Sequence, residues 1–329
     1  MKEYLKSVKF LIKRYLTRNS PIILCYHGVC SEKLDFPFFT HINKNLFEEH
    51  IAFLVKYFNC ISLNALMKQI RSKSCFTKNA VVVTFDDGFA NNFTEALPIL
   101  KKYRVPATVF ITVGLVDSPR FIWADLVPAM LSCTMMPTLL FDGTVFPITT
   151  AKEKQLVRLK ILSYLKTEKS EIIEEQLTSL LQQLKVNREE LFNNPTLRHC
   201  HGILSSDQIR GLHNSGLVEI GSHGMTHTIF SKLSSDEATK EIRKSKALVE
   251  EIIGEQITSF AYPNGTVKDF LPEHKQALRD SGYTAVLTTI QGRVHKKADP
   301  LQLPRFCISG EERVSGLKYL VSSQWTDKS

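Results

Sequence analysis

The amino-acid sequence predicts an α/β fold built on a parallel sheet. From residue 21 onward, short apolar runs rich in β-branched residues alternate with longer amphipathic patterns of helical period. This alternation is typical of βα units. The run at 81–85 (VVVTF) is almost wholly apolar, as expected for a strand buried on both faces. The chain is 43% hydrophobic and 23% charged over 329 residues, which is enough for one large globular domain or two small ones.

The first 18 residues have the pattern of a basic amphipathic helix. Apolar side chains recur at steps of three and four, and residues 1–20 carry six Lys or Arg against Glu3, a charge of +5 within the chain's net +9. Two interpretations are open: a helix lying on an anionic membrane surface, or a terminal helix packed against the fold. We expect residues 1–20 to form this helix and 21–329 to form the main domain.

Strands and helices of the main domain follow in order. Ser62 and Ser234 have side chains that cap helix N-termini. Pro106 and Gly254 stand where helices end. The expected strands are 21–26, 81–85, 107–112, 218–222, 257–260, 283–287 and 306–308. The expected helices are 45–58, 62–73, 93–104, 205–216, 234–253 and 272–281.

An insert interrupts this order at about 117–204. Residues 139–148 predict a small β-hairpin around an Asp-Gly turn. Residues 151–194 are helical in pattern and strongly charged, so we expect a solvated helical cap.

Three aromatic or imidazole side chains in the insert invite a functional interpretation. Trp123 suits stacking on a sugar ring, and it suits a core or lid position equally well. His199 and His201 follow the charged helical stretch. We expect neither histidine to bind metal, because no strand delivers them to a site.

The strand at 81–85 runs directly into Asp86, Asp87 and Gly88. Burying two adjacent carboxylates costs several kcal/mol unless something pairs with them. A metal ion is one remedy, with one carboxylate as a ligand and the other left as a base. Gly88 allows a sharp turn beside that charge. The alternative is an ordinary Asp-Asp-Gly turn at a strand end.

A second strand end carries two histidines. The strand at 218–222 is followed by His223 and His227. On one helical turn, a spacing of four places both imidazoles on one face, where they can share a metal ion. This spacing alone is weak evidence for a metal site, but its combination with the Asp-Asp-Gly strand end is a much more specific indication of one.

These motifs resemble those of the polysaccharide deacetylases, the NodB-homology group in family four of the carbohydrate esterases. Residues 84–88 (TFDDG) match the first motif of that family and 222–227 (SHGMTH) match the second, while 260–265 (FAYPNG) resemble the third. Residues 24–29 (LCYHGV) and 303–305 (LPR) resemble the branch with an N-terminal Tyr-His strand. The resemblance implies a distorted (β/α) barrel of about seven strands, with the site at the C-terminal strand ends.

The resemblance also implies a metal-dependent amide hydrolysis. Asp87, His223 and His227 would bind the ion, leaving positions open for water and substrate. Asp86 would act as the general base. A carboxylate with two imidazoles suits zinc, while nickel, cobalt and iron stay open. A bound ion of this kind lowers the pKa of water and polarises a carbonyl.

Other site residues follow from the resemblance less directly. The backbone N–H after Pro263, that of Asn264, would hold the oxyanion. The family often has an arginine in the third motif to orient the catalytic aspartate, but this chain has Ala261 there, and Arg305 is our candidate replacement. The usual late Leu-x-x-x-His acid is missing as well. In the matching branch, the histidine corresponding to His27 is the acid.

The expected function is therefore removal of N-acetyl groups from an N-acetylated sugar of a bacterial surface polysaccharide or its lipid-linked precursor. A catalytically inactive glycan-binding module is one alternative. A metallophosphohydrolase is another, although the chain lacks a glycine-rich loop that would cradle phosphate. No basic run with interleaved aromatics predicts nucleic-acid binding.

Seven scattered cysteines, without paired spacing, suggest reduced thiols and a cytoplasmic location. No apolar stretch is long enough to span a membrane, and we expect no signal peptide. Peripheral contact with the inner face of the membrane would then depend on the N-terminal helix.

Overall fold

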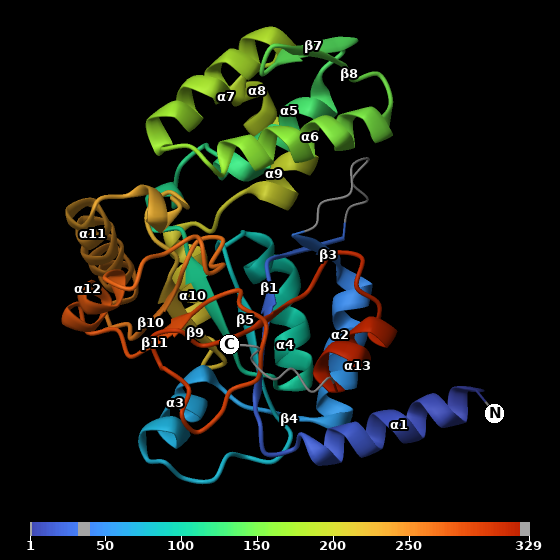
Figure 1. Cartoon of the computed structure of the whole chain (residues 1–329), viewed down its shortest axis with the longest axis vertical. Coiled ribbons are helices and arrows are strands. Elements are labelled where there is room, and N and C mark those ends of the chain that lie inside the picture. Colours follow the sequence, from blue (N-terminus) through green and yellow to red (C-terminus); the bar gives the residue numbers. More distant parts are fainter. Residues whose placement is uncertain (1, 32–39, 323–329) are drawn as a thin grey trace.

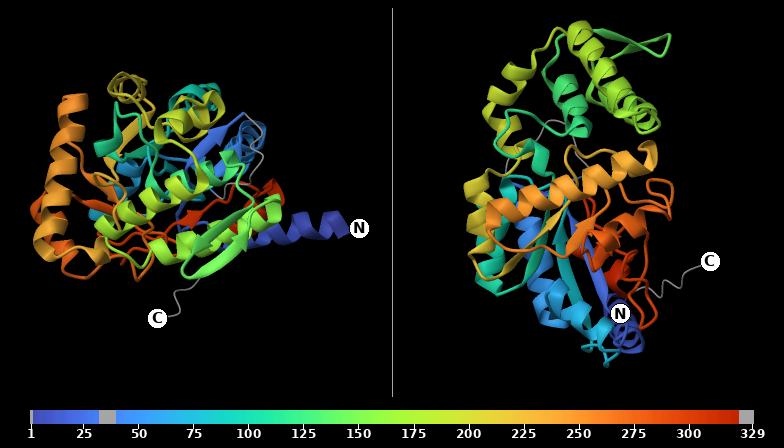
Figure 2. Two further views of the ribbon diagram at one scale, coloured as in Figure 1. Left: turned by 90° about the horizontal axis from the view of Figure 1, so that it is seen from above. Right: turned by 90° about the vertical axis from the view of Figure 1, so that its left-hand side faces the viewer.

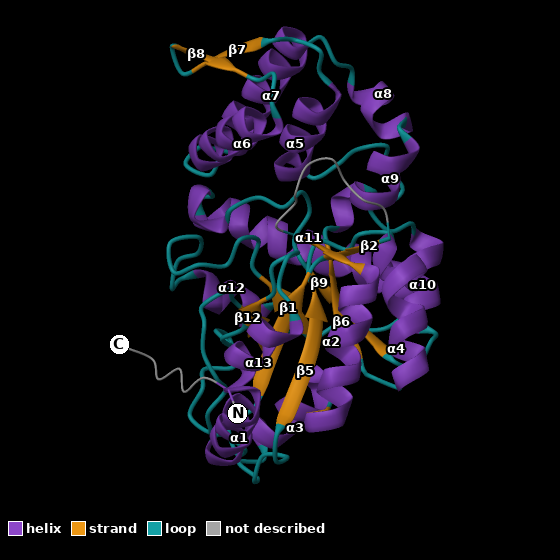
Figure 3. Ribbon diagram, turned by 90° about the vertical axis from the view of Figure 1, so that its right-hand side faces the viewer, coloured by secondary structure: helices purple, strands orange, loops and turns teal. Residues whose placement is uncertain are grey.

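A computed structural model describes residues 2–31 and 40–322. Its central sheet has the strand order β11-β10-β9-β6-β5-β1-β12, with β4 also paired to β5, and every pairing is parallel. The sheet curls into a half-barrel (Figure 3), so the predicted distorted barrel of about seven strands is confirmed. The strands are β1 (Ile22–Tyr26), β4 (Asn59–Cys60), β5 (Ala80–Phe85), β6 (Ala107–Ile111), β9 (Val218–Ser222), β10 (Ser259–Ala261), β11 (Ala285–Leu287) and β12 (Phe306–Cys307).

Helices pack around the outside of this sheet and bury its apolar residues. β5 is buried at all six positions, in agreement with its almost wholly apolar sequence. The surrounding helices are α2 (Lys44–Tyr57), α3 (Leu63–Arg71), α4 (Leu97–Tyr103), α10 (Ser206–His213), α11 (Ser235–Ile253), α12 (His274–Asp280) and α13 (Val314–Ser322). Short elements complete the connections: β2 (Gly28–Cys30), β3 (His41–Asn43), a π-helical segment (Asn92–Ala96) and two 3₁₀ turns (Val113–Leu115, Phe230–Lys232).

Most of the helix ends predicted from capping residues are confirmed. Ser234 forms a capping box with Glu237 at the start of α11, and Gly254 ends that helix with φ of 73°. Ser62 caps α3 as expected. Residue 45 was the wrong start for α2, because Asn43 is the N-cap and accepts a hydrogen bond from the backbone N–H of Asn45.

The N-terminal helix α1 (Lys2–Leu16) lies at the end of the sheet opposite the insert (Figures 1 and 2). Phe10 is buried against Phe53 and Tyr57 of α2, so part of the helix packs against the fold. Its other face leaves large apolar side chains exposed: Leu11, Ile12, Tyr15 and Leu16. Within residues 2–31 and 40–322, no helix has both the length and the apolar character needed to cross a membrane.

The insert is mainly helical and lies over the carboxyl ends of the strands (Figures 1 and 2). It has a separate hydrophobic core, so these helices form more than the solvated cap that their charge suggests. The predicted hairpin is present as β7 and β8. The elements are α5 (Trp123–Cys133), β7 (Thr138–Phe141), β8 (Thr144–Pro147), α6 (Ala151–Leu165), α7 (Ser170–Leu184), α8 (Arg188–Asn193) and α9 (Pro195–His201).

A disulfide joins the insert to the main domain. Cys30 of β2 and Cys200 of α9 are bonded, with their Cα atoms 5.9 Å apart and a sequence separation of 170. The expectation of seven reduced thiols is therefore wrong. Sequence spacing could not reveal this pair, because the two cysteines are far apart in sequence and no local pattern relates them.

Candidate active site

A cavity of about 620 Å³ lies between the strand ends and the insert. The half-barrel supplies its floor, because β1, β5, β9 and β10 all run toward the same edge. Helices α5 and α6 of the insert supply its roof. The lining includes His27, Asp86, Asp87, His223, His227, Asn264 and Cys307 from the strand ends, and Asp125, Arg158 and Lys166 from the insert.

Asp87, His223 and His227 converge in this cavity. Oδ1 of Asp87 lies 3.4 Å from Nε2 of His223 and 3.3 Å from Nε2 of His227. Nδ1–H of His223 donates to the carbonyl of Ala261 at 2.8 Å, which leaves the Nε2 lone pair directed at the cluster. Asp87 Oδ1 is buried and has no hydrogen-bond partner among the described residues. These donors therefore fit a divalent metal ion.

The ligand cluster is held by unusual backbone geometry. Asp87 has φ of 73°, His227 of 61° and Asn264 of 57°, all in the left-handed region. Such conformations cost of order 1 kcal/mol or more, and they cluster at functional sites. Residues 223–227 form a loop, so the expected helical turn is wrong, and the loop itself brings both imidazoles to Asp87.

Arg305 forms a bidentate pair with Asp86. Its two terminal nitrogens donate to Oδ1 and Oδ2 of Asp86 at 2.7 Å each, and Nε donates to the carbonyl of Thr288 at 2.8 Å. Arg305 is fully buried. The guanidinium therefore fixes the plane of the Asp86 carboxylate.

Electrostatics keep both aspartates ionised. Burial opposes the charge on Asp86, but Arg305 and then His223 outweigh it and hold the pKa of Asp86 at about 2. Burial also opposes the charge on Asp87, and its close contacts with the His223 and His227 imidazoles keep its pKa well below the usual range. Burial disfavours a proton on His223, whereas Asp86 and Asp87 raise the pKa of this imidazole.

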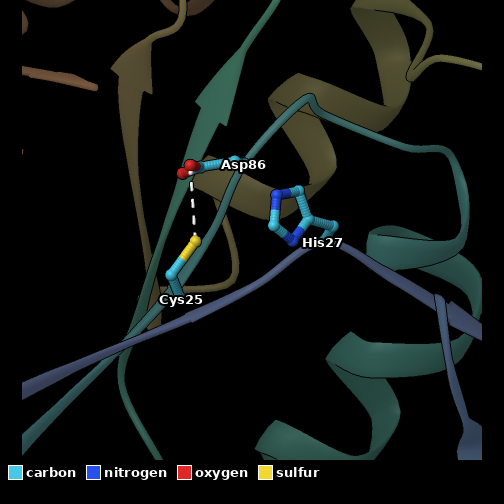
Figure 4. A group of neighbouring side chains, drawn as sticks. All are labelled: Cys25, His27 and Asp86. Carbon is cyan, nitrogen blue, oxygen red and sulfur yellow. Dashed lines mark hydrogen bonds between the residues drawn. The ribbon is translucent and has the colours of Figure 1, made fainter. Parts of the chain in front are cut away.

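His27 and Cys25 lie beside Asp86 at the end of β1 (Figure 4). Candidate ligand atoms of the three side chains lie within 4.8 Å of one another. Cys25 Sγ–H donates to Asp86 Oδ2 at 3.4 Å. Nδ1 of His27 is buried without a hydrogen-bond partner among the described residues, while the ring itself lines the cavity. Cys25 therefore contacts the catalytic-base candidate, a contact that the scattered cysteine spacing did not indicate.

The third motif, at residues 260–265, also reaches the cavity. Pro263 is buried, and Asn264 lines the cavity. The Pro263 carbonyl accepts a hydrogen bond from the backbone N–H of Gly265 at 2.7 Å, which orients the Pro263–Asn264 peptide, and the Asn264 carbonyl accepts one from the Thr289 hydroxyl at 2.6 Å. Asn264 therefore sits where a backbone donor could face a bound carbonyl.

The insert contributes residues that the motifs do not contain. Trp123 donates its Nε1–H to the carbonyl of His227 at 3.1 Å, which supports the left-handed loop. Asp125 and Arg158 line the roof of the cavity. They are more than 30 residues apart in a segment with no recognisable motif, so the sequence carried no signal that would have selected them.

The Arg305–Asp86 pair predicts a large stability effect. Arg305→Met should lower the free energy of unfolding by about 3–5 kcal/mol, because it leaves a buried carboxylate without a counter-charge. Urea denaturation monitored by circular dichroism measures this change. The double variant Arg305→Met/Asp86→Asn is the control and should recover part of the loss. Equal stability of Arg305→Met and the unaltered chain would contradict a strong pair.

Known proteins similar to this chain are polysaccharide deacetylases. The polysaccharide deacetylase family profile matches residues 73–136 and 141–286. A poly-beta-1,6-N-acetyl-D-glucosamine N-deacetylase of Staphylococcus aureus is 26% identical over 216 residues, covering 60% of this chain and 70% of that protein.

Solved structures show the same fold at low sequence identity. The deacetylase PplD of Streptococcus pyogenes matches with a TM-score of 0.59 at 16% identity, over 93% of this chain and 99% of that one. IcaB from Ammonifex degensii matches with a TM-score of 0.59 at 17% identity, over 93% and 98%. With the family profile covering more than half of its residues, this chain belongs to the polysaccharide deacetylase family.

Proposed function

We propose that this protein is a metal-dependent de-N-acetylase that acts on an N-acetylated amino sugar of a bacterial surface polysaccharide. The observation that carries the proposal is the Asp87–His223–His227 cluster next to an ionised Asp86 held by Arg305. The Staphylococcus aureus relative, named for poly-β-1,6-N-acetylglucosamine, supports a β-linked N-acetylglucosamine polymer as the substrate class.

In this proposal the ion, most simply zinc, would be held by Asp87, His223 and His227. When bound, it supplies a Lewis acid that activates water and polarises the acetyl carbonyl. Asp86 accepts the proton from the attacking water, and Arg305 keeps that carboxylate ionised and oriented. The backbone N–H of Asn264 donates to the oxyanion as it forms.

The departing amine needs a proton. His27 lines the same cavity as Asp86 and Asp87, and it directly follows β1 at the edge of the sheet where the other catalytic groups lie. Imidazole exchanges protons near neutral pH. We therefore assign to His27 the role of the acid that protonates the departing amine. Asp86 is the base for the earlier attack by water.

Mass spectrometry of chitooligosaccharides and of poly-β-1,6-N-acetylglucosamine oligosaccharides tests the activity. We expect loss of one acetyl group per event, with equimolar acetate released, and loss of the reaction on chelation. Phosphate release from phosphorylated sugars without acetate would instead support a metallophosphohydrolase. Binding of the oligosaccharides with neither product would support an inactive glycan-binding module. A lipid-linked sugar precursor assayed in parallel separates that substrate from the polymer.

We also propose that α1 binds an anionic membrane surface through its exposed apolar face. Leu11, Ile12, Tyr15 and Leu16 are exposed there, with Lys13 in the same segment. Each basic residue close to such a surface contributes on the order of 1 kcal/mol. The α1 end is opposite the cavity (Figures 1 and 2), so a chain docked in this way would present its active site away from the bilayer.

Substitution on that face tests the membrane contact. Ile12→Glu/Leu16→Glu should weaken binding to phosphatidylglycerol vesicles in a sedimentation assay, because it removes apolar area and adds negative charge. Val145→Glu, an exposed apolar position on β8, is the matched control. Unchanged vesicle binding by the double variant would leave α1 as a helix that only packs against the fold.

Cell fractionation tests the predicted cytoplasmic location. That prediction rested on reduced thiols, and the Cys30–Cys200 disulfide removes this support.

A further inference from the structure

A second group of two imidazoles and one carboxylate lies at the junction of the insert and the main domain. His41 comes from β3, Asp125 from α5 and His201 from the end of α9. All three side chains are buried. Each offers one candidate ligand atom, and these three atoms lie within 4.8 Å of one another. We propose that His41, Asp125 and His201 bind a second divalent metal ion of the zinc class.

The spacing of these atoms suits such an ion. Nδ1 of His201 lies 3.5 Å from Oδ1 of Asp125. A tetrahedral ion with bonds of about 2.0–2.1 Å holds neighbouring ligand atoms about 3.3 Å apart. The corresponding distance in the catalytic cluster, from His223 Nε2 to Asp87 Oδ1, is 3.4 Å. The two clusters therefore have the same donor types, and an imidazole–carboxylate separation that is nearly the same in both.

The tautomer of His41 is also set for metal binding. Its Nε2–H donates to the carbonyl of Cys200 at 2.8 Å, so the lone pair is on Nδ1. Nδ1 lies 3.0 Å from the Thr40 hydroxyl, a contact that a bound ion would replace. His223 shows the same arrangement, with one ring N–H bonded to a backbone carbonyl.

The position of this cluster gives the ion a structural role. His201 directly follows Cys200, whose disulfide to Cys30 already ties α9 to β2. Asp125 lines the active-site cavity and is two residues from Trp123, which donates to the His227 carbonyl. An ion at this cluster would therefore join three separate elements and hold the roof of the cavity over the catalytic loop.

Metal stoichiometry tests the second site. The full chain is stripped with a chelator, equilibrated with Zn²⁺ alone, desalted and measured by plasma mass spectrometry against amino-acid analysis. We expect two ions per unaltered chain. His201→Ala and Asp125→Asn should each retain one, His223→Ala should retain one, and His201→Ala/His223→Ala should retain none.

Two outcomes would overturn the proposal: a single ion in the unaltered chain that His223→Ala removes, or two ions retained by both His201→Ala and Asp125→Asn. Thermal unfolding shows whether each variant is folded, and it gives a second measurement of binding. In the His223→Ala background, Zn²⁺ should raise Tm, because an ion that binds only the folded state stabilises it. Adding Asp125→Asn to that background should remove the shift, and a shift that persists would also count against the second site.

Discussion

Replacing Asp86 with asparagine is expected to leave the metal ion bound and to lower kcat by roughly 10²–10⁴-fold, the range for a lost general base. Asp86 lies outside the Asp87–His223–His227 cluster, and both its oxygens are bonded to Arg305. Asparagine keeps the shape of the side chain and removes its capacity to accept a proton. Acetate release and metal content, measured on one preparation, check both halves of this expectation.

His223→Ala is the matched control, because it should lose the ion of the Asp87–His223–His227 cluster and the activity together. Asp86→Asn also leaves the buried Arg305 charge without its carboxylate, so the variant will be less stable. The assay is therefore run well below its unfolding temperature, with the fold verified by circular dichroism. Near-normal turnover in Asp86→Asn would remove Asp86 from the role of base.

The main features of the site could be predicted because they are local in sequence. Each motif is a short apolar strand followed directly by its polar residues, and parallel strands bring their carboxyl ends to one edge. Asp86 and Asp87 after β5, and His223 after β9, therefore meet without any long-range information. Arg305 lies 219 residues from Asp86 and immediately before β12, which pairs with β1, and its side chain reaches Asp86 from there.

What could not be predicted depends on contacts between distant loops. His201 was excluded as a ligand because no strand delivers it, but α9 carries it into contact with Asp125 and next to His41. No periodicity or turn signal encodes the meeting of those elements. The loop at 223–227 is a different case. Spacing favoured a helical turn, whereas Gly224, two residues after the strand, was a sequence signal for a loop. Its φ in the structure is 81°.

His27→Ala is expected to leave metal binding intact and to lower kcat on an N-acetylated glycan by roughly 10²–10⁴-fold, as for a lost general acid. His27 lines the cavity beside Asp86 but does not belong to the Asp87 cluster. The late histidine that serves as acid elsewhere in the family has no counterpart among the motifs of this chain. Acetate release and metal content are again measured together.

The choice of leaving group separates an acid from a structural histidine. An amine is expelled from the tetrahedral intermediate only with a proton, whereas an aryl oxide from an activated acetate ester leaves without one. If His27 is the acid, His27→Ala should lose far less activity on 4-nitrophenyl acetate than on the glycan. A residue that merely shapes the cavity would affect both substrates alike, because metal, base and oxyanion donor serve both reactions. Equal losses, or loss of the ion, would therefore exclude His27 as the acid.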